Sequence, residues 1–517
     1  MDIRKIHASQ IEITPPKVQD RPQEGSGSVR DSISLGKNQA QPVKIDILHM
    51  NDLHGTIDPV MDPEVSADSP VGGLANSKAL IDREKAQNPD GTMVLCAGDL
   101  AEGTMVSYLS KGKVVADALK EMDFDATALG NHDFAWGQDD LKTMLQMAET
   151  PVVAANVVKT DTGEVMDGAE PFIMKKANGI NVGIIGLDTP EITHFVAKSK
   201  LEGLNFLGAA ETVKKWLPEV KKQGADLVVV LSHLGFEEDK KLAKEVEGID
   251  VIVGGHSHSK LEKGHTEGDT IIVQAGAMTH RLGKLELNID PESKRIVSHK
   301  AQLLPIVQKE LTPDPAIQKI LAPYRAKCEK LGAKEMGFAR EDLLYAHREA
   351  GKLNQIHADS ILKASGAQFG ICNSRTLRAH VKAGKVTMKD LYSALPFTEE
   401  NYVRMEATGK MIMNEIEDDL RDDATELAVP TGLKYEYDPS QPEGNRLQKA
   451  FLPDGTRLEP DRKYMVVVNE TMSRKPAFKN VTHKKVLGGC QKVFFDYFKK
   501  GGIWSDDADD RVKVVNK

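Results

Sequence analysis

Short apolar runs recur along the first half of the chain, and each is followed closely by glycine, aspartate, asparagine or histidine. From Val43 onward the runs are VKIDIL, TMVLCAG, DATALG, NVGIIGL, DLVVVLS, IDVIVGG and TIIVQAG. Between several of them lie amphipathic stretches, namely VVADALKEM, DDLKTMLQMA and ETVKKWLPEVKKQ. Short strands that alternate with helices are typical of a sheet covered by helices. The pattern therefore predicts an α/β fold, either a sandwich or a doubly wound layer structure.

The pattern changes after Leu304 and Pro305, where longer helical stretches replace the alternation. The segment KELTPDPAIQKILAPYRAKCEKLG indicates one connecting helix, or a helix pair interrupted at Pro323. Beyond Gly337, helices such as LNQIHADSILKAS and isolated strands such as KYMVVVNE favour an α+β domain. The start of the chain is rich in Gln, Ser, Gly, Pro and charge, which predicts a flexible tail. We therefore expect a tail at 1–42, an α/β domain at 43–304, a helical linker at 305–336 and an α+β domain at 337–517.

Composition narrows the class of protein. The 517 residues contain 68 Lys and Arg against 77 Asp and Glu, a formal net charge of −9. Bulk charge therefore does not favour binding to a nucleic-acid polymer, and any attraction for an anion has to be local. A hydrophobic content of 40% with 28% charged residues is typical of a soluble globular protein. No apolar run approaches the roughly 20 residues of a membrane-spanning helix, so we expect no membrane span.

The cysteines and the first residues of the chain indicate in which cellular compartment the protein works. The four cysteines are far apart and form no C-x-x-C pair, which argues against a disulfide framework and against a cysteine zinc site. The first residues also lack the apolar core of a secretory signal. We therefore expect a cytoplasmic protein. The sequence does not indicate an oligomeric state.

Potential metal ligands and proton carriers follow five of the predicted strands. They occur in the segments ILHMNDLHG, CAGD, ALGNHDF, VLSHLG and VGGHSH. Because ligands bind outside the carboxyl ends of the strands in open α/β sheets, these segments can converge at one rim. The residues are Asp52, His54, Asp99, Asn131, His132, Asp133, His233, His256 and His258.

The chemistry of these side chains indicates metal binding. Carboxylate, imidazole and amide oxygen suit Mn²⁺, Zn²⁺, Fe or Co, and the absence of thiolate argues against a structural zinc. Seven candidate ligands exceed what one tetrahedral ion needs. Two ions about 3.5–4 Å apart would use them, with a bridging carboxylate, and would hold both a nucleophilic water and a phosphoryl oxygen. The predicted reaction is hydrolysis of a phosphate ester.

The ordered set NDLHG, GD, GNHDF, SHLG and GGHSH resembles the calcineurin-like metallophosphoesterases, in particular the two-domain 5′-nucleotidase family. That family includes UDP-sugar hydrolases and 2′,3′-cyclic nucleotide phosphodiesterases. The resemblance covers roughly residues 43 to 510. It implies an N-terminal α/β sandwich of two sheets flanked by helices, and a C-terminal α+β domain that binds the substrate.

The resemblance also implies a dinuclear site for two divalent ions of Mn, Zn, Co, Fe or Mg. Asp99 would bridge them. The other ligands would be Asp52, His54 and His258 for one ion, and Asn131, His233 and His256 for the second. The ions would activate a water near neutral pH.

His132 is the implied catalytic residue, which stays off the metals and faces the scissile phosphate. Family members commonly place an aspartate three residues after this histidine to orient it. This chain has Ala135 there, and Asp133 is not assumed to substitute, because the family usually has an acidic residue at that position too. We therefore expect His132 to lack an orienting partner, with weaker control of its tautomer.

Segments of the second domain resemble the family's substrate pocket. HREAGKLNQIHADSI suggests Arg348 as a phosphate contact, and CNSRTLR suggests Asn373 and Arg378. A guanidinium fork suits bidentate phosphate binding. LPFTEEN and DYFKKGGIWSDD suggest Phe397 and Tyr497 as the aromatic rings that stack on a nucleobase.

Several positions depart from the family pattern. Ile503 aligns with the aspartate that contacts ribose hydroxyls, and an apolar side chain cannot accept those hydrogen bonds. Further changes are found at Arg375, Thr376, Glu399 and Trp504. We therefore expect a retained hydrolytic half and a remodelled specificity half.

Three functions fit these observations. The first is a nucleotidase-like phosphomonoesterase acting on a small phosphorylated substrate. The second keeps the site but changes the bond to a phosphodiester, as in a cyclic nucleotide or a UDP-sugar, or to the thiosulfonate of a related sulfur-oxidation enzyme. The third is a binding protein that holds metals without turnover, which the completeness of the ligand set disfavours.

Overall fold

The structure is a computed structural model that describes residues 41–194, 196–396, 400–424, 426–499 and 511–516. The predicted tail lies almost entirely outside the described residues. So do Phe397, Glu399, Ile503 and Trp504, and the predictions made for them stay predictions.

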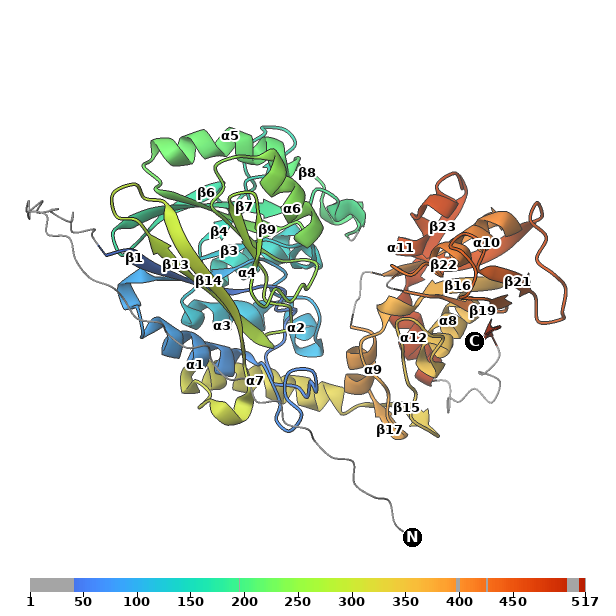
Figure 1. The fold of residues 1–517 in the computed structure, drawn as a ribbon. Coiled ribbons are helices and arrows are strands. Elements are labelled where there is room, and N and C mark those ends of the chain that lie inside the picture. Colours follow the sequence, from blue (N-terminus) through green and yellow to red (C-terminus); the bar gives the residue numbers. More distant parts are fainter. Residues whose placement is uncertain (1–40, 195, 397–399, 425, 500–510, 517) are drawn as a thin grey trace, which may run out of the picture. The chain divides into compact units, whose positions relative to one another are not determined.

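The N-terminal region contains two six-stranded sheets (Figure 1). The first has the order β14-β13-β1-β2-β3-β4, in which β1 to β4 run parallel and β13 and β14 continue the sheet antiparallel. Its strands are β1 Val43–Met50, β2 Thr92–Cys96, β3 Ala126–Ala128, β4 Val152–Val153, β13 Arg281–Ile289 and β14 Ile296–Pro305.

The second sheet has the order β11-β12-β10-β9-β7-β6, with a parallel centre and one antiparallel strand at each edge. Its strands are β6 Phe172–Ala177, β7 Ile180–Asp188, β9 Leu227–His233, β10 Val251–Gly254, β11 His265–Glu267 and β12 Thr270–Val273. A separate short pair joins β5 Val157–Lys159 to β8 Leu204–Phe206. All seven predicted apolar runs are strands of the two large sheets.

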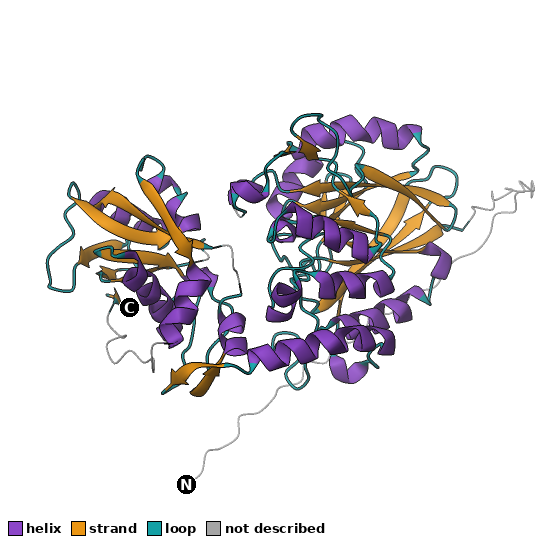
Figure 2. Cartoon of the chain, turned by 180° about the vertical axis from the view of Figure 1, so that it is seen from behind, coloured by secondary structure: helices purple, strands orange, loops and turns teal. Residues whose placement is uncertain are grey.

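Helices cover the outer face of each sheet, and the two inner faces pack on each other (Figures 1 and 2). The helices on the first sheet include α1 Leu74–Lys85, α3 Lys113–Met122 and α4 Gln138–Ala148. Those on the second are α5 Ala209–Lys222 and α6 Phe236–Glu245. A short helix, α2 Met105–Ser110, follows β2 in the chain. The predicted α/β sandwich is confirmed.

Strand alternation explains these layers. In β1, Ile45 and Ile47 point into the core between the sheets, whereas Leu48 and Met50 belong to the core under the helices. Successive side chains of a strand face opposite sides, so a strand covered on both faces has to be apolar along most of its length. This is why the sequence shows continuous apolar runs rather than strict alternation.

After β14, helix α7 Pro315–Gly332 continues without a break through Pro323. The segment is therefore a single helix and not a helix pair interrupted at Pro323. Asp314 caps it by accepting a hydrogen bond from the Ile317 backbone N–H, and Pro315 occupies the first turn, where no N–H is needed.

The C-terminal region has a five-stranded sheet of order β19-β16-β22-β18-β23. These strands are β16 Phe369–Asn373, β18 Asn401–Thr408, β19 Ala428–Thr431, β22 Lys463–Asn469 and β23 Lys484–Gly489. The smaller sheets pair β15 Glu335–Ala339 with β17 Gly384–Thr387, and β20 Lys434–Tyr437 with both β21 Leu447–Phe451 and β24 Val512–Val514. The helices are α8 Lys352–Ser365, α9 Met388–Ala394, α10 Gly409–Asp418, α11 Glu470–Ser473 and α12 Cys490–Lys499.

None of the helices in the described ranges combines the length and the apolar composition that crossing a bilayer requires.

Candidate metal centre

The predicted ligands come together where strands of both large sheets end. Asp52 and His54 follow β1, Asp99 follows β2, and Asn131 lies in the 3-10 turn Asn131–Phe134 after β3. From the second sheet, His233 is the last residue of β9, and His256 and His258 follow β10. Two sheets that pack face to face therefore supply one site, as expected for the carboxyl ends of parallel strands.

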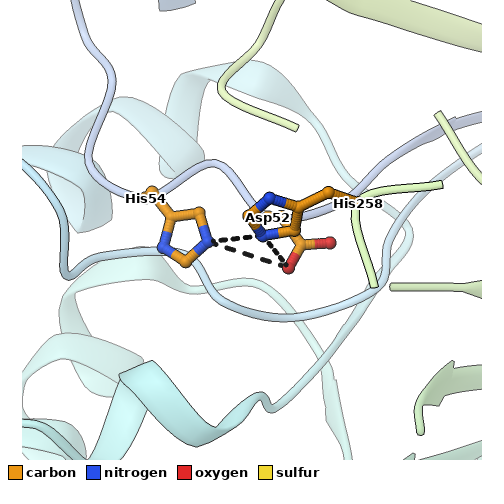
Figure 3. A group of neighbouring side chains, drawn as sticks. All are labelled: Asp52, His54 and His258. Carbon is orange, nitrogen blue, oxygen red and sulfur yellow. Dashed lines mark hydrogen bonds and ion pairs between the residues drawn. The ribbon is translucent and has the colours of Figure 1, made fainter. Parts of the chain in front are cut away.

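Asp52, His54 and His258 form the first group that can hold a metal ion (Figure 3). The Nε2 atoms of His54 and His258 lie 3.0 Å apart. Asp52 Oδ1 lies 3.3 Å from His258 Nε2 and 3.8 Å from His54 Nε2. Asp52 and His54 are buried, whereas the His258 side chain is 40% exposed, so the group opens to solvent on the side of His258.

Asp99, His233 and His256 form a second group of this kind, and Asp99 belongs to a third with His54 and His132. Asp99 Oδ2 lies 3.1 Å from His233 Nε2 and 3.8 Å from His54 Nε2. Asp99 is therefore close to the ligands of the first two groups, which is the position that a bridging carboxylate has to occupy.

Hydrogen bonds from neighbouring backbone orient two of the imidazoles. His54 Nδ1 lies 2.8 Å from the Glu102 carbonyl, and His233 Nδ1 lies 2.6 Å from the Ala97 carbonyl. A carbonyl only accepts, so Nδ1 of each ring carries the proton and Nε2 is directed toward the cluster. Asp52 is held in a similar way by the side-chain amide of Asn51, which donates to Asp52 Oδ2 at 2.6 Å.

The backbone at the candidate ligands is strained. Five of them have left-handed backbone conformations, with φ of 52° at Asp52, 48° at His54, 53° at Asp99, 69° at His256 and 55° at His258. Such conformations cost residues other than glycine about 1 kcal/mol or more each, and they concentrate at functional sites.

Burial and mutual charge set the protonation of the cluster. Burial lowers the pKa of His54 to about 3 and that of His256 to about 4, so both rings stay neutral and keep a lone pair. Burial acts against the ionised form of Asp99, but His233 and His132 outweigh it and hold its pKa well below the usual range. The neutral rings of His54 and His256 and the ionised Asp99 are the forms that bind a metal ion. At His233, burial is outweighed by Asp99 and Asp52, which raise the pKa well above its usual value, so a metal ion there would have to displace a proton.

One buried atom supports the fit of this donor set to a cation. Asn131 Oδ1 is buried and has no hydrogen-bond partner among the residues that the structure describes. An unpaired buried acceptor costs free energy unless a water or an ion satisfies it. The carboxylates, imidazoles and amide oxygen therefore fit divalent ions that accept nitrogen and oxygen ligands.

His132 has a carboxylate partner that the sequence did not reveal. Its Nδ1 lies 2.6 Å from Oε2 of Glu102, a buried residue of the loop after β2. The prediction that His132 lacks an orienting partner is therefore wrong. Burial lowers the pKa of His132, but Asp99 and the hydrogen bond to Glu102 outweigh burial and raise it to about 9.

Asp133 has a different role. Its carboxylate accepts hydrogen bonds from the backbone N–H groups of Asp99, Leu100 and Gly130, at 3.1, 2.8 and 2.9 Å. Burial, followed by the charge of Asp99, raises its pKa to about 7. Asp133 thus ties the loop after β2 to the turn after β3.

The substrate-binding candidates of the C-terminal region engage nearby backbone. Arg348 donates to the carbonyls of Arg421, at 3.1 Å, and Ala424. Arg378 donates to the carbonyls of Leu377, at 3.0 Å, and Arg375. These guanidinium groups are thus oriented by protein contacts, and their predicted role in binding phosphate stays a prediction.

The remaining substrate-binding candidates in the described residues are Asn373 and Tyr497. Asn373 accepts the Arg375 backbone N–H at 2.6 Å and donates to Glu426, so it caps the turn that follows β16. Tyr497 is half-buried, with the Lys363 ammonium 5.2 Å from its ring centre. Stacking of Tyr497 on a base stays a prediction.

Comparison with known proteins agrees with the site. The family model for calcineurin-like phosphoesterases matches residues 45–260, and that for the C-terminal domain of 5′-nucleotidases matches residues 335–477. Together the two cover well over half of the chain. The chain belongs to the two-domain family that joins a calcineurin-like phosphoesterase to a 5′-nucleotidase C-terminal domain, and it is a metal-dependent phosphoester hydrolase.

Individual relatives span both regions. An apyrase of Aedes aegypti is 28% identical over 527 residues, which cover 91% of this chain and 92% of the relative. The endonuclease YhcR of Bacillus subtilis is 28% identical over 487 residues, but the match spans only 39% of that longer protein. Among solved structures, the 5′-nucleotidase precursor of Thermus thermophilus is 27% identical with a TM-score of 0.77, over 92% of this chain and 100% of that chain.

Proposed function

We propose that this chain is a dinuclear phosphomonoesterase that acts on nucleotides. The observation that carries the proposal is the position of Asp99 between two groups of metal-compatible side chains, 3.8 Å from His54 Nε2 and 3.1 Å from His233 Nε2. Relatives named as apyrases and 5′-nucleotidases support a nucleotide as the substrate.

The ligands of the two ions follow from the groups around Asp99. Asp52, His54 and His258 would hold one ion with Asp99, and Asn131, His233 and His256 would hold the other with the same carboxylate. When bound, two such ions lower the pKa of water and offset the charge on phosphoryl oxygens. The net charge of −9 makes this local positive site necessary for an anionic substrate.

His132 would act on the substrate directly. Its side chain is 25% exposed, and its raised pKa keeps the ring cationic at neutral pH. Glu102 holds Nδ1, and the Nε2–H group would stabilise charge on a phosphoryl oxygen or protonate the leaving oxygen.

The C-terminal region would supply specificity. We propose Arg348 and Arg378 as phosphate contacts, and Asn373 and Tyr497 as further contacts to the nucleotide. The departures from the family pattern favour a phosphate monoester that differs from the usual nucleoside monophosphate in its sugar.

The test compares turnover of AMP, UDP-glucose and a 2′,3′-cyclic nucleotide, with an aryl phosphate as a general substrate. Protein freed of metal with a chelator should be inactive and should recover with Mn²⁺ or Co²⁺. AMP turnover above that of both diesters supports the monoesterase. Preference for a diester would replace it with the phosphodiesterase alternative, and no turnover with two bound ions would favour a binding protein.

A further inference from the structure

Glu102 occupies an unusual place in the candidate metal centre, because it contacts two histidines through different groups. Its carbonyl oxygen lies 2.8 Å from Nδ1 of His54, and its carboxylate Oε2 lies 2.6 Å from Nδ1 of His132. The residue is only 3% exposed. A carboxylate buried this deeply is costly unless it is paired, so the contact with His132 is a main determinant of its conformation.

The loop that carries Glu102 is fixed along its length to the segment after β1. The backbone N–H groups of His54 and Gly55 donate to the carbonyls of Asp99 and Leu100, each at 3.0 Å. The Thr104 hydroxyl donates to the Gly55 carbonyl at 2.7 Å. These bonds flank Glu102 on both sides, so the position of its backbone is well determined.

Gly103 shows how close this approach is. Its φ is 149°, and a Cβ atom there would lie 2.6 Å from the His54 carbonyl oxygen and 2.8 Å from the His54 Cβ. Only glycine allows the chain to pass at this distance. The tight packing holds the Glu102 carbonyl on His54 while the Glu102 side chain reaches His132.

Backbone contacts fix the turn that carries His132. Its backbone N–H donates to Asp99 Oδ1 at 2.8 Å, and its ring lies edge-on to the ring of His54, with centroids 4.9 Å apart. The neighbouring Asp133 is committed to three backbone N–H groups, and Ala135 offers only a methyl group. Within its own turn, then, no carboxylate of the described residues is bonded to the His132 ring.

We propose that Glu102 is the positioning residue for His132. By accepting the Nδ1 proton it holds the ring in one orientation, in which the Nε2–H group would face the substrate. In this chain the carboxylate comes from the loop after β2 rather than from the turn that carries the histidine. The inference rests on the proposed role of His132 as a catalytic residue.

Kinetics of the full-length Glu102→Gln and Glu102→Ala variants test this role. We expect kcat to fall roughly 10- to 100-fold, more for alanine than for glutamine, while KM stays within about twofold and metal content is unchanged. Glu84→Gln is the matched control, because Glu84 is also buried and pairs with Lys284 at 3.0 Å in a different part of the same region. A kcat within twofold of the wild type in folded Glu102→Ala overturns the proposal, and so does a loss of bound metal that accounts for the lost activity.

A second readout does not depend on turnover. In protein labelled with ¹⁵N-histidine, the His132 ring should show a protonated Nδ1 in the wild type and in Glu84→Gln. In Glu102→Ala we expect the ring ¹⁵N and ¹H signals of His132 to shift, because the Nδ1 proton loses its acceptor. His132 signals that do not change would overturn the positioning role. If the wild type hydrolyses no phosphate ester, the proposed function fails, while this measurement still decides whether Glu102 orients the ring.

Partial restoration by a second substitution gives an independent check. Adding Ala135→Asp to Glu102→Ala returns a carboxylate to the turn, and we expect it to recover part of the lost kcat. Ala135→Asp alone should give no increase, because the ring already has its partner. Equal losses in the folded single and double variants, with unchanged His132 signals, would assign Glu102 a merely structural role and contradict the proposal.

Discussion

The carboxylate of Asp99 lies 3.1 Å from Nε2 of His233, and this contact joins the end of β2 in one sheet to the end of β9 in the other. Both side chains are almost fully buried. Because each sheet supplies part of the ligand set, the packing of the two sheets determines the geometry of the metal centre.

Asp99→Asn is expected to lower kcat for an aryl phosphate at least about a hundredfold, because it removes the carboxylate charge proposed to bridge the two ions. Metal bound per chain should fall as well. The exposed Asp161→Asn is the control and should behave like the wild type. Activity in Asp99→Asn close to that of the control would rule out a bridging role.

His132→Gln and His54→Gln should both lose activity, but only His54→Gln should also lose metal. Removing the ring of His132 is expected to reduce kcat about 100-fold or more with metal content retained, because His132 is proposed to act on the substrate. His54→Gln should lose metal together with activity. Kinetics combined with metal analysis distinguish the two, and loss of metal from His132→Gln would reassign that residue as a ligand.

A buried carboxylate group in the C-terminal region predicts a pH-dependent stability. Lys475 Nζ lies 2.9 Å from Glu415 and 2.7 Å from Asp419, and Glu415 is 1% exposed. Burial raises the pKa of Glu415 from 4.5 to about 7, against the attraction of Lys475. A carboxyl group with a raised pKa in the folded state binds its proton more tightly there, so this contribution to stability is lost as the pH rises from 4.5 to about 7.

Glu415→Gln should therefore be more stable than the wild type at pH 8, by roughly 2 kcal/mol, and about equally stable at pH 4. Urea unfolding at the two pH values measures the difference. The exposed Glu349→Gln should show no such dependence. A variant that is less stable than the wild type at pH 8 would mean that the ion pair with Lys475 outweighs the cost of burial.

Arg378→Gln is expected to raise KM about tenfold with a small change in kcat, because the guanidinium is proposed to bind ground state and transition state alike. Arg404→Gln is a matched control, since Arg404 also donates to a backbone carbonyl, that of Ser365 at 2.9 Å. Equal KM values for the two variants would remove Arg378 from the substrate site.

Much of the fold and of the metal centre follows from the sequence because both have local signatures. A strand covered on both faces must be apolar, and the polar residues that interrupt it after a glycine are conspicuous, as in GGHSH. Glu102 has no such signature, because a glutamate between alanine and glycine in GDLAEG is typical of an exposed loop. Its partner His132 is 30 residues away, and the loop is brought to the ring by hydrogen bonds to the segment after β1.

For the substrate-binding candidates of the C-terminal region, the sequence does not predict which groups each side chain contacts. The family resemblance locates Arg348 in the chain, but its guanidinium contacts the carbonyls of Arg421 and Ala424, which are more than 70 residues away in sequence. Spacing along the chain carries no information on such contacts.

Metal titration of the chelated full-length protein, with turnover followed at each step, tests the central claim most directly. A dinuclear hydrolase should bind two equivalents of Mn²⁺ per chain, and hydrolysis should reach its plateau only when the second equivalent is bound. Asp99→Asn should neither bind two equivalents of Mn²⁺ nor reach the wild-type rate of hydrolysis. Full activity with one equivalent, or turnover that persists without metal, would contradict the account.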